Sequence, residues 1–83
     1  MPYIKHEDRS RMDSIVNHMW ESGVKANGDL NYILYAFCKR CVDPSYNNYK
    51  NFCGELRQCA TEVERRLLGP YEDTKIEENG DVN

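Results

Sequence analysis

Three segments of the sequence carry apolar residues at helical spacing, and none alternates apolar and polar residues as a half-buried strand does. The spacing predicts helices over about residues 7–22, 29–42 and 46–68. In each segment the apolar positions recur every three or four residues, which places them on one face of the helix. The pattern therefore predicts an all-α protein, a small bundle built on three main helices.

Residues that favour helix ends mark the limits of the first two helices. Gly23 tolerates left-handed backbone and is expected to stop the first helix, while Asn27 can cap the free amides of the second. Pro44 disfavours helical geometry in the residue before it and so ends the second helix. Ser45 is expected to cap the third.

The third helix is expected to stop near Gly69-Pro70, because this pair interrupts or kinks a helix. Pro70 also suits the first turn of a new helix, so a short fourth helix is predicted over about residues 70–78. Residues 1–83 then form a single helical domain with a frayed acidic C-terminal end.

The third helix is much longer than its predicted partners, at about 35 Å for some 23 residues. Part of its apolar face must overhang them, and Gly54 would let another backbone come close. A chain this short has difficulty building a sufficient core, so a homo-oligomer is expected. The apolar face comprises Tyr49, Phe52, Cys53, Leu56, Ala60, Val63 and Leu67.

Composition and charge narrow the classes of function. The chain has 83 residues and a formal net charge of −3. Residues 69–83 hold five acids against one base, whereas residues 1–68 hold ten bases and nine acids. The body of the protein is thus nearly neutral, and nucleic acid is an unlikely partner because no global positive field would attract it.

The N-terminal residues are rich in charges where a secretion signal needs an apolar stretch of about 7 to 15 residues, and no window approaches the length of a membrane span. These patterns favour a cytoplasmic protein with no membrane contact. In a reducing cytosol the four cysteines are expected to remain thiols.

Cys38 and Cys41 have the spacing of half a zinc site, but no second pair completes it. Cys53 and Cys59 lie six helical steps apart, about 240° around the axis, and cannot converge on one ion. The cysteines on apolar faces are therefore interpreted as packed thiols, and no metal or other cofactor is expected.

Enzymatic activity is not expected. The acidic residues of the C-terminal half invite comparison with magnesium-dependent nucleotide pyrophosphohydrolases, whose sites need paired carboxylates on facing helices. Only Asp73 and Glu77 stand one turn apart, and the second helix offers no facing pair. This hydrolase activity is the weakest of the alternatives.

Bases and tyrosines in the C-terminal half could instead bind an anionic ligand. Arg65, Arg66 and Lys75 are cationic, and arginine offers a planar fork for phosphate. The other interpretation is a solvated face with ion pairs such as Glu62 to Arg66. Six of the nine aromatic residues are tyrosines, which supply amphipathic contact area. The candidate ligand-binding residues are Arg65, Arg66, Tyr71 and Lys75, with Asn31 and Tyr32 as secondary contacts.

Particular segments resemble a known family. The chain is similar to a family of short, helical, uncharacterised proteins found in tailed phages and in prokaryotic genomes. The resemblance covers nearly the whole chain, and the closing Glu78-Asn79-Gly80-Asp81-Val82 is its most specific part. The matching segments are Met1-Pro2-Tyr3-Ile4-Lys5, Glu7-Asp8-Arg9, Gly28-Asp29-Leu30-Asn31-Tyr32, Glu62 with Arg65-Arg66, and Pro70-Tyr71-Glu72-Asp73 through Lys75-Ile76 to Val82.

The resemblance implies a phage-borne or mobile-element protein, in the cytoplasm of a bacterial host, and it carries no assigned chemistry. Small helical phage proteins of this class commonly act by binding. The first hypothesis is a homo-oligomeric counter-defence protein that sequesters a cyclic or ADP-ribose-type nucleotide immune signal. The alternative is an inhibitor or adaptor directed at a host protein.

Overall fold

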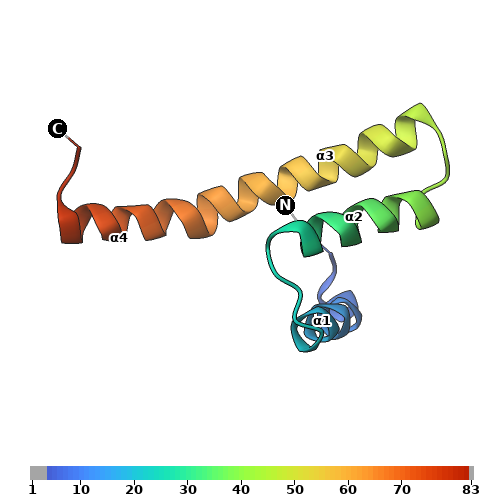
Figure 1. Cartoon of the computed structure of the whole chain (residues 1–83), viewed down its shortest axis with the longest axis horizontal. Helices are drawn as coiled ribbons and strands as arrows, with labels where there is room; N and C mark the ends of the chain where they lie inside the picture. Colours follow the sequence, from blue (N-terminus) through green and yellow to red (C-terminus); the bar gives the residue numbers. More distant parts are fainter. Residues whose placement is uncertain (1–3, 83) are drawn as a thin grey trace. The chain divides into compact units, whose positions relative to one another are not determined.

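The computed structural model describes residues 4–82, and all regular elements in that range are helical (Figure 1). Helix α1 spans His6–Glu21, α2 spans Gly28–Cys41 and α3 spans Tyr46–Val63. The all-α prediction is confirmed, and the first two helices begin and end within one residue of their predicted limits. The predicted Met1, Pro2 and Tyr3 motif lies outside the described residues.

The connection between α1 and α2 follows the predicted cap chemistry. Gly23 has a positive φ of 75°, and its amide donates to the Trp20 carbonyl at 3.0 Å. The Asn27 side chain accepts a hydrogen bond from the Asp29 amide at 2.9 Å, which caps α2. A second bond joins the Val24 amide to the Met19 carbonyl at 3.1 Å. These bonds hold the turn close to the end of α1.

Ser45 caps α3 as predicted. Its hydroxyl accepts a hydrogen bond from the Asn48 amide at 3.0 Å, and the Asn48 side chain donates to the Asp43 carbonyl at 3.0 Å. Helix α2 already ends at Cys41, three residues before Pro44, so only residues 42–45 connect α2 to α3.

The predicted break at Gly69-Pro70 is wrong, because the helix continues through it. A π-helical turn, η1 (Glu64–Leu68), joins α3 directly to α4 (Gly69–Asn79). The Gly69 amide bonds to the Glu64 carbonyl five residues back, and a Cβ at Gly69 would lie 3.3 Å from that same oxygen. Pro70 occupies the start of α4. A wider turn relieves the clash between a proline ring and the preceding carbonyls, so the helix can continue into α4.

Helix α4 ends as predicted at Asn79-Gly80. Gly80 has a φ of 84°, and its amide bonds to the Ile76 carbonyl at 2.8 Å. Glycine adopts this left-handed conformation without the penalty that a Cβ brings. Residues 80–82 follow with no regular structure.

The chain divides into two compact units, residues 4–49 and residues 50–82. The first contains α1 and α2 and the start of α3. The second contains one regular element, the continuous helix of α3, η1 and α4, so it has no core of its own. An isolated helix of this kind gains little stability without a covered apolar face. The expected single domain and oligomeric state stay predictions.

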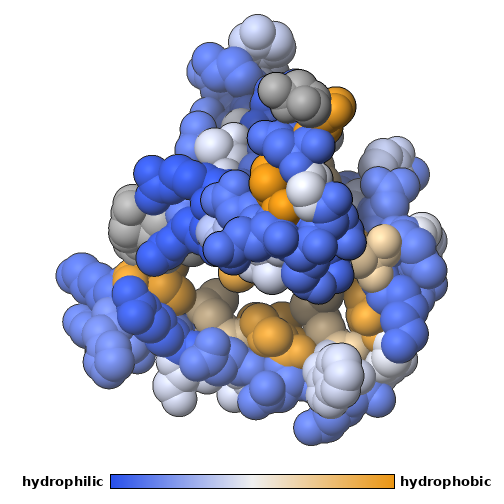
Figure 2. All heavy atoms as spheres, turned by 90° about the vertical axis from the view of Figure 1, so that its left-hand side faces the viewer, coloured by the Kyte–Doolittle hydropathy of each residue, from blue (hydrophilic) through white to orange (hydrophobic). Residues whose placement is uncertain are grey.

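Apolar side chains remain accessible throughout the described part of the chain. None of its residues is buried, and orange apolar side chains reach the surface in Figure 2. The described helices include none that is both long enough and apolar enough to pass through a membrane.

Candidate functional site

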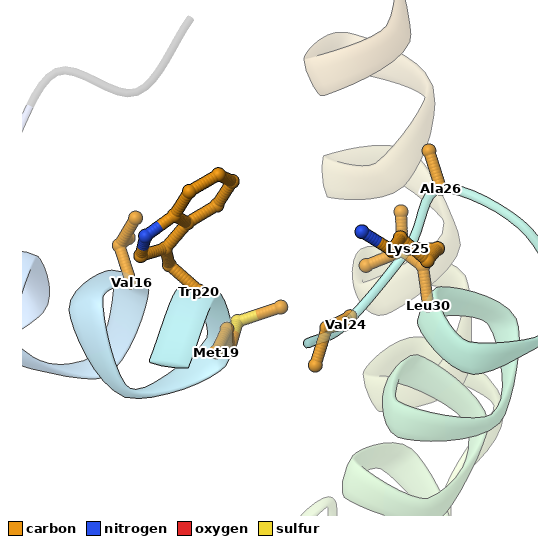
Figure 3. A pocket seen from close by; sticks show the side chains of 7 residues that line it. All are labelled: Val16, Met19, Trp20, Val24, Lys25, Ala26 and Leu30. Atoms are coloured by element: carbon orange, nitrogen blue, oxygen red, sulfur yellow. The ribbon is translucent and has the colours of Figure 1, made fainter. Parts of the chain in front are cut away.

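A shallow, largely open apolar pocket of about 330 Å³ lies where α1 passes into α2, within the first compact unit (Figure 3). Side chains from the end of α1 form one wall, and Leu30 of α2 stands opposite. The connecting segment contributes the floor between them. The lining residues are Val16, Met19, Trp20, Val24, Lys25, Ala26 and Leu30.

Local hydrogen bonds hold the connecting segment that carries Val24 and Lys25. The Lys25 amide donates to the Asp29 carboxylate at 3.2 Å, and the Leu30 amide donates to the Lys25 carbonyl at 3.3 Å. Both bonds tie the segment to the first turn of α2. Together with the Gly23 turn, they fix the spacing of the two pocket walls.

Trp20 gives the pocket its main contact surface. The residue is 80% exposed and stands at the end of α1, with the indole ring on the pocket side (Figure 3). A large exposed aromatic beside aliphatic side chains is the composition of a binding hot spot. Lys25 is the one charged side chain in the lining. The pocket can therefore accept an apolar or aromatic group with a nearby negative charge.

The sequence pattern did not predict the pocket. Val16 and Met19 are apolar residues of α1, and Leu30 is an apolar residue of α2. The pocket exists because the Gly23 turn brings these residues together around the connecting segment. The available signal was the pair of apolar residues, Val24 and Ala26, inside a turn that is otherwise polar.

The predicted arginines lie in η1 and pair with a carboxylate on the same helix. Arg66 reaches Glu62 at 3.6 Å and Arg65 reaches it at 3.8 Å. The predicted Glu62 to Arg66 ion pair is thus confirmed. The Glu62 side chain is 15% exposed, whereas both arginine side chains are mostly exposed. Such exposed pairs stabilise a helix by only about 0.3–0.5 kcal/mol each.

Tyr71 and Lys75 form a second group, one turn apart on α4. The Lys75 Nζ lies 5.5 Å from the centre of the Tyr71 ring, within the range of a cation–π contact. The same nitrogen lies 3.5 Å from Glu78. The arginines pair with Glu62, which precedes η1, whereas Lys75 pairs with Glu78, which follows it. The two groups therefore do not form a single anion site.

The secondary candidates, Asn31 and Tyr32, lie in the first turns of α2, in the other compact unit. The Asn31 amide donates to the Asn27 carbonyl at 3.2 Å as part of the helix start. Tyr32 is exposed. The use of these six residues as a ligand site stays a prediction.

One comparison with known proteins decides the family. The family described as a domain of unknown function, DUF6899, matches residues 1–82. The chain belongs to this family. No curated protein and no solved structure matches it. The description of the family names no activity.

The cysteines and carboxylates of this DUF6899 member are dispersed. All four cysteines are free thiols; Cys38 is half-buried, and the other three are exposed. Packing within the single chain therefore does not account for Cys41, Cys53 and Cys59. In residues 4–82 no group of three or more histidine, cysteine or acidic side chains is arranged to hold a metal ion.

Proposed function

We propose that this protein is a non-enzymatic binding protein that acts as an inhibitor or adaptor of another protein. The observation that carries the proposal is the α1–α2 pocket with Trp20 at its edge. An 80% exposed tryptophan next to Met19 and Val16 leaves a large apolar surface in water. A protein partner that inserts an apolar or aromatic side chain would cover it.

The resemblance to phage-borne proteins supports a partner from the bacterial host, with counter-defence as the biological role. Lys25 favours a partner that carries an acidic residue beside its apolar anchor. The pocket has no carboxylate or histidine in its lining that could serve as a general acid or base. A binding role therefore accounts for the pocket better than a catalytic one.

Photo-crosslinking from the pocket tests the proposal. With a photoreactive aromatic in place of Trp20, one host protein is expected to crosslink in a stoichiometric complex. The matched control carries the same group at Tyr35, an exposed aromatic on α2 outside the pocket lining. Trp20→Ala should then weaken binding of the purified partner by about 10-fold or more. Equal crosslinking from both positions, or unchanged affinity, would contradict the proposal.

A second candidate function is sequestration of a nucleotide signal on α4. The observation that favours it is the 5.5 Å approach of the Lys75 Nζ to the Tyr71 ring, which offers a stacking face and a cation together. Calorimetry with ADP-ribose and cyclic dinucleotides is expected to give a binding signal that Lys75→Ala abolishes and Lys39→Ala leaves unchanged. Absence of heat with the wild-type oligomer would remove this candidate.

A further inference from the structure

The backbone beside the α1–α2 pocket has few hydrogen-bond donors left for a bound segment. In the segment that connects the two helices, the amides of Gly23, Val24 and Asn27 donate to carbonyls of the chain itself, at 2.9–3.1 Å. The Lys25 amide donates to a side-chain carboxylate at 3.2 Å. Within this described segment, only the Ala26 amide is left to donate to a ligand.

The first turn of α2, on the other side of the pocket, is closed in the same way. The Asp29 amide donates to the Asn27 side chain at 2.9 Å, and the Leu30 amide donates to the Lys25 carbonyl at 3.3 Å. An extended peptide needs alternating donors and acceptors on the surface with which it pairs. The pocket does not supply them, so a bound segment must satisfy its own backbone groups, as a helix does.

The pocket is also small. Its volume of about 330 Å³ lies near the lower end of the range of about 300–1,000 Å³ that is typical of ligand pockets, and it is open to solvent. A contact of this size cannot offset a large ordering cost on binding. A segment that is ordered before it binds is therefore favoured over one that must fold on the pocket.

The charge at the pocket is a single ammonium group. Figure 3 shows the nitrogen of Lys25 directed toward Trp20, across the space between the two walls. Among the described residues this ammonium has no ion-pair partner. The other lining side chains are apolar or aromatic. A carboxylate close to an apolar anchor would therefore complement the pocket in charge.

We infer that the pocket binds one amphipathic helix of the partner protein. A large apolar side chain of that helix lies between Trp20 and Leu30, and an aspartate or glutamate one turn away lies beside Lys25. Residues three or four apart on a helix are about 5–6 Å apart on the same face, so one helix can present both groups. The inference rests on the proposed binding function and specifies which element of the partner is bound.

Fluorescence of Trp20 tests the helical form of the bound segment, because this residue is the one tryptophan of the chain. The probe is an alanine-rich helical peptide with a leucine and, one turn away, a glutamate. The matched peptide has proline at its centre, on the face away from the leucine, and cannot form the helix. The helical peptide should shift the emission to shorter wavelength in a saturable way, and the proline peptide should bind at least about 10-fold more weakly.

Charge reversal tests the acidic residue. The wild-type protein should bind the glutamate peptide several-fold more tightly than a peptide with lysine in its place, and Lys25→Glu should reverse this preference. The matched control is Lys39→Glu, because Lys39 is an exposed residue of α2 outside the pocket lining. This control variant should keep the wild-type preference.

Equal binding of the helical and proline peptides, or no shift with either, would overturn the inference. An unchanged preference in Lys25→Glu would also overturn it. Each of these results can occur while crosslinking from position 20 still captures one host protein. Failure of the inference is therefore distinguishable from failure of the proposed function, in which that crosslink is absent or equals the control.

Discussion

Leu67→Glu is expected to weaken self-association of the protein and to lower its mass in solution. Leu67 is 66% exposed, and residues 50–82 contain no second element that could cover it. A glutamate there would place a carboxylate without a partner in an apolar contact between copies. The affinity between copies should fall on the order of 10-fold or more. Light scattering measures the mass directly.

The same variant should lose helix content when it dissociates, because residues 50–82 have no core of their own to support the helix. Far-UV circular dichroism detects this loss. Thr61→Glu is the matched control, since Thr61 lies on the opposite side of the helix and its hydroxyl only contacts the Arg57 carbonyl at 3.0 Å. If both variants dissociate, or neither does, Leu67 is not part of a contact between copies.

Gly23→Val is expected to damage the α1–α2 pocket, whereas Gly23→Asn should leave it intact. Gly23 has a φ of 75°, which a β-branched residue adopts at a cost of about 1–3 kcal/mol and asparagine tolerates well. Relief of that strain would move Val24 and Lys25 away from Trp20. Crosslinking from position 20 should therefore fall sharply in the valine variant only.

Chemical unfolding of the two Gly23 variants provides the stability measurement. The valine variant should unfold at lower denaturant than the asparagine variant. A Cβ added at Gly23 would meet no atom of a non-neighbouring residue within 4 Å, so the difference comes from the backbone conformation. Equal stability and equal crosslinking in the two variants would show that the left-handed turn does not determine the pocket.

Helix positions could be predicted from the sequence because they depend on local chemistry. Asn27 and Ser45 cap the helices they were expected to cap, and Gly23 and Gly80 adopt the left-handed backbone expected of them. The break at Gly69-Pro70 was wrong because a proline rule for regular α-helices does not anticipate a π-turn. Widening the turn by one residue accommodates the proline and leaves the helix continuous.

The candidate pocket was harder to predict than the helices, because it depends on the path of the segment that connects α1 to α2. The Glu62 to Arg66 ion pair needed only helical spacing, and it is present. The pocket needed the path of residues 22–27, which brings Trp20 and Leu30 to opposite walls.

Sedimentation equilibrium of the unmodified protein tests most directly whether its exposed apolar surface serves association. The mass is expected to be a multiple of the 9.8 kDa of one chain. A mass of 9.8 kDa that persists as the concentration is raised to the millimolar range would contradict the expected homo-oligomer.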